Sequence, residues 1–172
     1  MAKKKGAWFK PGDKIVYPGY GVGTVRCFED RNIGGEDRTF VVLDFNEAEN
    51  VSVVRVPLDK VEDVGLRPIS KPKEVKAAVA LLKSGEPEIL SSWKDRFADH
   101  GDKLAAGDLS SVATVLKALW ILNGRKPLSF REKKMYQKTL LLLSSEFAEV
   151  QKKSREDAER EILALLEAAG GA

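Results

Sequence analysis

The sequence predicts an α+β multidomain chain, in which a small antiparallel β barrel precedes a compact all-α domain of about five helices. Two observations support this prediction. Up to about residue 67, short runs rich in Val, Ile, Phe and Thr alternate with glycine and polar turns, whereas beyond Pro72 the apolar residues recur at helical spacing. Pro68 and Pro72 interrupt both patterns. We therefore expect a barrel at 1–67, a linker at 68–72 and a helical domain at 73–172.

Four segments of the first domain are predicted strands: 13–18, 21–30, 37–46 and 51–57. A short fifth strand is expected near 60–64. Strands that recur about every ten residues in so short a segment are typical of a strongly bent sheet of the SH3 or Tudor kind. The edge strands of such a sheet are natural docking surfaces.

The first turn of the barrel admits two interpretations. Gly19, Gly21 and Gly23 are spaced as in loops that bind phosphate, but such loops lead directly into a helix. Here Val22 to Val25 continue as a strand, and Pro18 and Gly19 are typical turn residues. We interpret the segment as a strand, a turn and a second strand.

The first two helices of the second domain are predicted at 73–83, ending at Gly85, and at about 92–106, ending at Gly107. In the first, Val75, Val79 and Leu82 share one face. In the second, Phe97 and Leu104 are the candidate core residues.

Three more helices follow. The third begins after Asp108 as N-cap and is expected to end at Asn123-Gly124. The fourth begins after Ser129, which forms a capping box with Glu132, and the last runs from Ser154 to about residue 169. Helical phase places one set of residues of the fourth helix on an apolar face and another on a basic face; the sets are Tyr136, Leu140, Leu143 and Phe147, and Arg131, Lys134 and Lys138.

The composition excludes several classes of protein. The chain has 172 residues and a net charge of +3. It has no apolar run near the roughly 20 residues that span a bilayer, and residues 1–6 lack the apolar stretch of a signal peptide. We therefore expect a cytoplasmic protein with no membrane partner. The single cysteine, Cys27, is read as a small apolar residue of a strand.

No catalytic or metal-binding set of residues is evident. His100 is the one histidine, so a metal site would lack the further His and Cys ligands that it needs. We expect His100 at the surface or in a cap before Gly101. No nucleophile motif is present, and the carboxylates lie mostly among lysines and arginines. The sequence predicts neither an enzyme nor a cofactor or metal site.

Trp93 is the residue whose position is hardest to predict. It starts a helix after Ser91 and Ser92, and it is flanked by Lys94 and Arg96. A tryptophan in a first turn commonly tucks into a helical core. An exposed aromatic ring among cations is also what nucleic-acid binding requires, because the cations hold phosphates and the ring stacks on bases. From these residues alone, both interpretations stay open.

A basic stretch runs from Lys117 to Lys138. Its 22 residues contain seven Lys or Arg and a single acidic residue, Glu132, for a net charge of +6. Solvated helix faces usually mix both signs, so a stretch of one sign favours a polyanionic partner such as nucleic acid. A merely solubilising surface is the alternative.

Five motifs in this order resemble the CarD family of bacterial transcription regulators, in its compact CdnL-like form. They are FKPGDKIVYPGYGVG at 9–23, VRVPLDKVEDVGLR at 54–67, SSWKDRF at 91–97, LAAGD at 104–108 and LSFREKKM at 128–135. The resemblance covers nearly the whole chain. It implies a Tudor-like domain that binds the β subunit of RNA polymerase and a helical domain that contacts promoter DNA at the upstream edge of the melted bubble.

The resemblance also implies site residues. Trp93 matches the tryptophan that wedges into the minor groove, Arg96 a basic residue beside it, and Lys133 a position that contacts phosphate. Lys94, Arg131 and Lys134 complete the expected DNA-binding set, while Asp95 stands where the family often has a second basic residue. On the barrel, the expected polymerase-binding residues are Arg31, Arg55 and Pro57.

The function implied is stabilisation of the open promoter complex by a factor that is not an enzyme, needs no cofactor and reaches the nucleoid through polymerase. We expect a monomer. The alternative is a protein-interaction adaptor of the transcription machinery that makes no direct contact with DNA.

Overall fold

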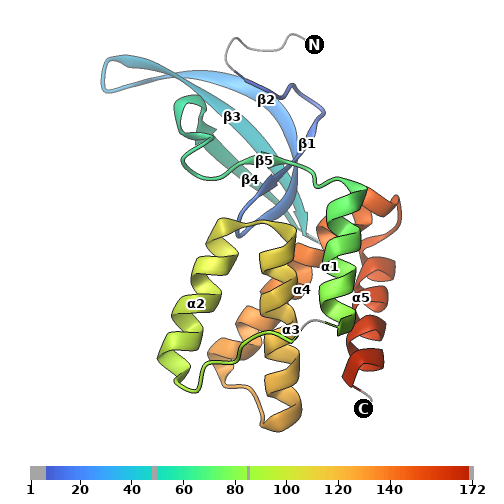
Figure 1. The fold of residues 1–172 in the computed structure, drawn as a ribbon. Coiled ribbons are helices and arrows are strands. Elements are labelled where there is room, and N and C mark those ends of the chain that lie inside the picture. The colour runs from blue at the N-terminus through green and yellow to red at the C-terminus, as the bar shows by residue number, and fades with distance from the viewer. Residues whose placement is uncertain (1–6, 48–49, 85, 171–172) are drawn as a thin grey trace. The chain divides into compact units, whose positions relative to one another are not determined.

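The computed structural model describes residues 7–47, 50–84 and 86–170. It divides the chain into two compact units, Met1–Ile69 and Ser70–Ala172. The division falls inside the segment that the sequence analysis takes as the linker. Figure 1 shows strands in the first unit and helices in the second, as the fold class predicted from the sequence requires.

The N-terminal unit is a five-stranded antiparallel sheet in the order β4-β3-β2-β1-β5. Its strands are β1 Lys14–Tyr17, β2 Gly21–Ile33, β3 Glu36–Glu47, β4 Asn50–Pro57 and β5 Arg67–Pro68. The core of this unit is a single cluster of buried apolar side chains, which are those of Ala7, Phe9, Ile15, Val25, Val41, Leu43, Phe45, Val56, Val61 and Leu66. The sequence prediction of a small antiparallel β domain is confirmed.

The segment between β1 and β2 is a tight turn, not a phosphate loop. Tyr17 pairs with Gly21, and the amide of Tyr20 donates to the carbonyl of Tyr17 over 2.9 Å. Gly19 and Gly21 have φ of 85° and 90°, a backbone conformation that residues with a side chain rarely adopt. Because β2 follows at once, no helix N-terminus is available to hold an anion.

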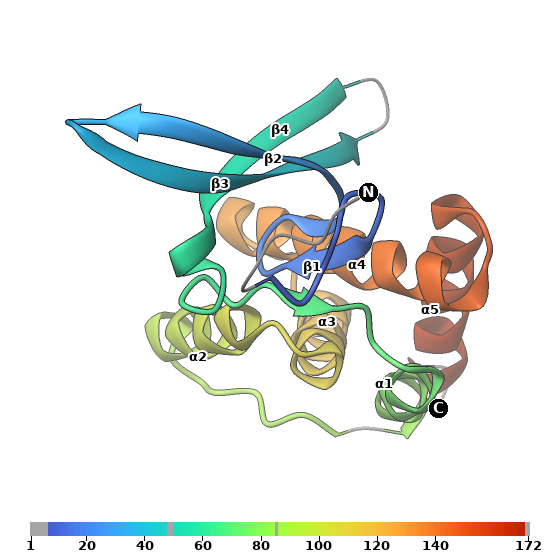
Figure 2. The ribbon, with the colours of Figure 1, turned by 90° about the horizontal axis from the view of Figure 1, so that it is seen from above.

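Strands β2 and β3 form a hairpin that is longer than the sequence predicts (Figure 2). Pairing continues to Ile33 and Glu36, although residues 31–36 are polar or glycine apart from Ile33. Side chains support the extension, since the Asn32 amide donates to Asp37 over 2.8 Å and its carbonyl oxygen accepts from the Gly35 amide over 3.1 Å. A bulge between Val25 and Cys27 bends β2.

The prediction of a fifth strand near 60–64 is wrong. Residues Leu58–Lys60 form a 3-10 helix, and the Val64 amide donates to the carbonyl of Lys60. The fifth strand is β5, Arg67–Pro68, which pairs with Ile15 and Val16 of β1. One residue assigned to the linker, Pro68, therefore belongs to the sheet. Gly65, with φ of 74°, lets the chain turn into that strand.

The C-terminal unit contains five described helices, as predicted. They are α1 Pro72–Ser84, α2 Trp93–Ala106, α3 Leu109–Arg125, α4 Phe130–Gln151 and α5 Arg155–Gly170. Helix α3 packs against α1, α2 and α4, and α5 packs against α1 and α4. Their shared core is built largely from Val75, Leu82, Leu109, Val112, Leu116, Leu140, Leu143, Phe147, Ile162 and Leu166.

The helix ends follow the local sequence closely. Ser92, Asp108 and Ser129 cap α2, α3 and α4, and Gly107 ends α2 in the left-handed region with φ of 73°. The predicted end of α3 at Asn123-Gly124 is wrong, because the helix continues to Arg125. No helix in the described ranges has the length and apolar character needed to cross a bilayer.

Candidate nucleic-acid interface

Trp93 is the first residue of α2, and 53% of its surface is exposed. The side chain of Ser92 caps the helix by accepting from the Asp95 amide, so the helix begins at the tryptophan. The structure thereby resolves the two interpretations of its position: Trp93 lies at the surface and not in the core.

Phe97, one turn further along α2, is also exposed, by 41%. The prediction that it fills the core is wrong. Residues four apart lie on the same side of a helix, so Phe97 shares the exposed side of Trp93. Leu104 does pack against the helical core, as predicted.

Arg96 is buried, with a side chain only 6% exposed. Its Nη1 donates to the carbonyls of Leu90 and Ser91 over 2.7 and 2.8 Å, and its Nη2 pairs with Glu132 over 3.2 Å. These bonds fix the residues just before Trp93 and connect α2 to α4. The structure thus gives Arg96 a positioning role, and direct contact between Arg96 and DNA stays a prediction.

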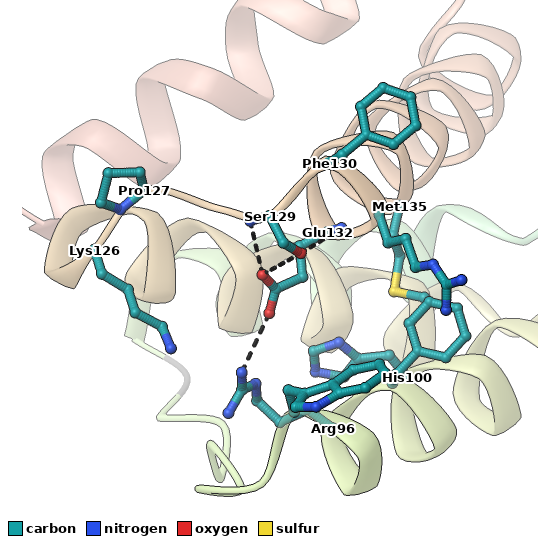
Figure 3. A pocket seen from close by; sticks show the side chains of 11 residues that line it. Arg96, His100, Lys126, Pro127, Ser129, Phe130, Glu132 and Met135 are labelled. Carbon is teal, nitrogen blue, oxygen red and sulfur yellow. Dashed lines mark hydrogen bonds and ion pairs between the residues drawn. The ribbon is translucent and has the colours of Figure 1, made fainter.

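Glu132 joins two structural elements through one carboxylate (Figure 3). Its Oε2 accepts from the amide and hydroxyl of Ser129 over 2.9 and 2.7 Å, which completes the predicted capping box, while Oε1 faces Arg96. Burial favours the neutral acid, but the bonds from Ser129 and Arg96 prevail and hold the pKa of Glu132 below its usual value. The carboxylate is therefore ionised where it braces the site.

A cavity of about 650 Å³ opens between α2 and the start of α4. Its apolar lining comes mainly from Trp93, Phe97, Phe130 and Met135, and Figure 3 shows Phe130 and Met135 along the first turns of α4. Phe130 is 71% exposed. The sequence analysis missed Phe130; the available signal was its place just after the Ser129 cap, where a side chain has few neighbours.

His100 lines the same cavity and is only 4% exposed. The prediction of a surface or cap position is wrong. It lies seven residues after Trp93, on the side of α2 that meets α4, and burial lowers the pKa of its imidazole. The ring is therefore neutral near pH 7.

Exposed cations occur on and next to the two helices that line the cavity. Lys94, Arg131, Lys133 and Lys134 of the predicted DNA-binding set are all exposed, and Lys126 and Arg131 line the cavity itself. The Lys134 ammonium lies 4.6 Å from the centre of the Phe130 ring, at the distance of a cation–π contact. The structure therefore gathers residues from two motifs, 91–97 and 128–135, around one opening.

Lys117, the first residue of the basic stretch, does not belong to this surface. It is 5% exposed, and its ammonium donates to the carbonyl of Leu82 over 2.7 Å. Burial lowers the pKa of Lys117. Six of the seven cations in the stretch are exposed, and these keep the surface basic.

On the N-terminal unit, a single carboxylate brings Arg31 and Arg55 together. Both guanidinium groups bond to Glu29, at 2.8 Å from Arg31 and 3.0 Å from Arg55. The bond from Arg55 is the main reason why the pKa of Glu29 is lowered, with a further contribution from Arg31. Pro57 pairs with Phe40, which also pairs with Glu29, so the three predicted polymerase-binding residues lie near one another.

Strand β4, which carries Arg55, is an edge of the sheet. Val51 and Val53 alternate with Ser52 and are 59% and 38% exposed. An edge strand leaves one row of backbone donors and acceptors unpaired, so β4 combines this row with apolar and cationic side chains. Such a surface suits a protein partner.

Within the described residues, no group of three His, Cys, Asp or Glu side chains could hold a metal ion. The cavity between α2 and α4 contains one carboxylate, Glu132, and that carboxylate is already paired.

Both units match known domains. Residues 9–70 match the CarD-like/TRCF RID domain, an RNA polymerase-interacting domain, and residues 77–163 match the CarD C-terminal domain. A putative transcription factor, YdeB of Bacillus subtilis (strain 168), is 29% identical over 138 residues, which cover 80% of this chain and 89% of the relative.

The two matches occur in the same order as the two units and together include the sheet and most of the helical core. The chain is thus a member of the CarD family, whose proteins act in transcription regulation with RNA polymerase.

Proposed function

We propose that the N-terminal unit binds the β subunit of RNA polymerase and that the helical unit binds promoter DNA near the upstream edge of the melted bubble, which stabilises the open complex. The observation that carries this proposal is the exposed Trp93 ring, which begins α2 just after the carbonyls that Arg96 holds and lines one cavity with the exposed cations Lys126 and Arg131. Such a factor works in the cytoplasm, at the nucleoid.

The DNA face combines two kinds of contact. Lys94, Arg131, Lys133 and Lys134 supply phosphate contacts that depend on salt and not on sequence. Trp93 supplies an apolar ring that enters the minor groove where base pairs already part. Arg96 acts through position, since its hydrogen bonds set where the helix and its first residue begin.

The wedge works by differential affinity. A ligand shifts an equilibrium only as far as it binds one state better than the other. A flat ring that replaces lost base stacking has a better partner at an open fork than in closed duplex, so Trp93 favours the open complex. Phosphate contacts alone, which both states offer, would not do so.

For the polymerase contact, the exposed β4 edge and the Arg31, Arg55 and Glu29 cluster offer backbone pairing together with charge. Binding there tethers the helical unit beside the promoter. A tether raises the effective concentration of a weak DNA-binding face without any new DNA contact.

The test of the wedge is the lifetime of the open complex formed by polymerase and the full-length chain. Substitution of Trp93 by Ala should shorten the lifetime by the equivalent of roughly 1–3 kcal/mol, the usual contribution of aromatic stacking on a base. Trp8, a second exposed tryptophan, lies in the N-terminal unit, so Trp8→Ala is the matched control and should leave the lifetime unchanged. Equal lifetimes for wild type and Trp93→Ala would overturn the wedge.

A protein-interaction adaptor is the second candidate, because exposed Phe97 and Phe130 would also suit a protein partner. Binding of the full-length chain to forked promoter DNA in the presence of polymerase separates the two functions. The proposed function predicts a DNA contribution that weakens steeply with salt, whereas an adaptor would show no such contribution.

A further inference from the structure

We infer that Glu146 of α4 is a positioning residue, which limits the free connection between the two units to the single residue Ile69. This inference rests on the proposed function and goes beyond it, because it states what makes the attachment of one unit to polymerase effective for DNA binding by the other. Glu146 lies in none of the five sequence motifs and in neither of the proposed binding surfaces.

The sheet holds the connection on its N-terminal side. Strand β5 is antiparallel to β1, so that Arg67 pairs with Val16 and Pro68 with Ile15. Ile15 and Val16 are both buried. Nη1 of Arg67 also donates to the carbonyl of Pro68 over 3.1 Å, and the proline ring fixes its own φ. The chain is therefore ordered as part of the sheet up to Pro68.

The helical unit holds the chain again two residues later. The amide of Ser70 donates to Oε1 of Glu146 over 2.8 Å, and the two residues are 8% and 3% exposed. They are 76 residues apart in the sequence, and both belong to the C-terminal unit. This bond fixes the first residue of that unit against α4. A single residue, Ile69, thus separates the last residue of the sheet from a residue that is bonded to α4.

Helix α1 does not depend on this bond for its start. The amide of Lys71 donates to Oε2 of Glu74 over 2.7 Å, and the amide of Glu74 donates to the carbonyl of Lys71 over 2.9 Å. Pro72 suits the first position of a helix, and Val75 and Leu82 anchor α1 in the core. The bond between Ser70 and Glu146 lies outside the helix, so its effect falls on the connection.

The chemistry of position 146 supports this role. A carboxylate is almost never fully buried unless it is paired, because the loss of hydration is costly. Glu146 lies next to Phe147 and one turn after Leu143, both of which are core residues with no exposed surface. An apolar side chain would suit this place in the helical unit but could not accept the Ser70 amide. The carboxylate is therefore what retains Ser70.

A short connection makes the tether to polymerase effective. Once polymerase holds the sheet, the effective concentration of the DNA-binding unit at the promoter depends on the length and freedom of the connection. Without the bond to Glu146, Ser70 and Lys71 would join Ile69 as free residues. Each free residue adds up to roughly 3.5 Å of reach, together with conformational freedom that must be lost again when both units are bound.

The first test needs neither polymerase nor DNA. It measures amide hydrogen exchange and ¹⁵N relaxation of the full-length chain by NMR. In the wild type, the Ser70 amide should be protected, and Ser70 and Lys71 should be as rigid as α1. Glu146→Ala should make both residues mobile and speed exchange of the Ser70 amide about tenfold, because its buried hydrogen bond is lost.

Two further variants make this first test specific. Glu146→Gln keeps an oxygen that can accept the Ser70 amide, so it should restore most of the protection. Glu167→Ala removes an exposed carboxylate from α5 and should change nothing at Ser70. Equal protection of Ser70 in the wild type and in Glu146→Ala would overturn the inference and leave the proposed function untouched.

The second test measures binding of the full-length chain to three targets: polymerase alone, forked promoter DNA alone, and the open complex of polymerase and promoter. We expect Glu146→Ala to bind the open complex about fivefold or more weakly, the effect of ordering at least one more backbone residue. Its affinity for polymerase alone and for DNA alone should be unchanged, because both binding surfaces lie elsewhere. Damage to the helical unit itself would weaken binding to DNA alone as well.

An insertion tests the connection without any change to α4. Two glycines inserted after Ile69 should weaken binding to the open complex as Glu146→Ala does, and this variant decides the question if Glu146→Ala does not fold. Wild-type affinity of the insertion variant for the open complex would overturn the role of the connection alone. A wild-type chain that binds the open complex no better than it binds polymerase would overturn the proposed function and this inference together.

Discussion

His100 is the single histidine of the chain, and its burial makes the helical unit sensitive to pH in a defined direction. Burial lowers its pKa, and the nearby charges of Asp99, Lys103, Arg96 and Glu132 act in both directions around it. The unfolded chain, with an ordinary histidine pKa near 6.5, therefore takes up a proton at a higher pH than the folded chain does.

We predict that the free energy of unfolding falls as pH decreases through about 6.5, because only the unfolded state gains the proton in that window. Urea unfolding followed by circular dichroism at 222 nm from pH 7.5 to 5.5 measures the effect, and His100→Gln should flatten the slope. The pKa of Glu132 is lowered from 4.5, so its contribution is lost only in a separate, more acidic window. An equal slope for wild type and His100→Gln would contradict the prediction.

At the scale of single residues, the sequence predicted which residues form the candidate site but not which of them are buried. The motif around Trp93 drew attention to a residue that the structure shows to be exposed, but residues 93, 96, 97 and 100 all occur near the start of one helix. Which of them is exposed depends on how α2 packs against α3 and lies beside the start of α4, and the pairing of Arg96 with Glu132 spans 36 residues. A local sequence pattern cannot predict a contact between residues so far apart in the sequence.

Helix ends illustrate what local sequence does encode. The caps Ser92, Asp108 and Ser129 were predicted from residue type and spacing, and all three accept a backbone amide in the structure. Helix α4 differs at its C-terminal end, where Lys152 adopts a left-handed conformation with φ of 56° that glycine would adopt more easily.

We predict that Lys152→Gly stabilises the helical unit by about 1 kcal/mol, since it removes the steric cost of a side chain in this conformation and loses only part of that gain to the freer unfolded chain. The measurement is the free energy of unfolding by urea, followed by circular dichroism at 222 nm. Gly107→Ala, at φ of 73°, is the reciprocal control and should destabilise. A loss of stability on Lys152→Gly would refute the prediction.

At the scale of elements, errors arose where tertiary packing prevails over propensity. Val61 and Val64 suggested a strand, yet both pack their side chains on the barrel core from a turn that Lys60 and Asp63 close with an ion pair of 2.9 Å. Asn123-Gly124 suggested a helix end, yet the Lys126 amide still donates to the carbonyl of Leu122 and extends α3 past them. Propensity is a weak guide where burial decides.

At the scale of the whole molecule, the two units divide the work of binding. The proposed polymerase surface lies on the sheet, and the proposed DNA surface lies on α2 and α4. The contact with polymerase determines the protein concentration at which the promoter complex is half saturated. The contact of Trp93 with DNA determines how far the equilibrium between closed and open complex shifts once the protein is bound.

We therefore predict different defects for two variants in a titration of open-complex lifetime against protein concentration. Arg55→Glu reverses a charge on the sheet and should raise the half-maximal concentration with no change in the plateau. Trp93→Ala should lower the plateau. Arg160→Glu, an exposed arginine of α5, is the matched control for the charge reversal. An unchanged half-maximal concentration for Arg55→Glu would place the polymerase contact elsewhere.

The bonds from Arg96 to the carbonyls of Leu90 and Ser91 have an evolutionary consequence. They anchor the chain from Leu90 onward to the helical framework, so the preceding residues 86–89 do not determine where α2 starts. An insertion or deletion among these preceding residues should therefore leave Trp93 in place, so the length of this loop and the position of the tryptophan can change independently in evolution.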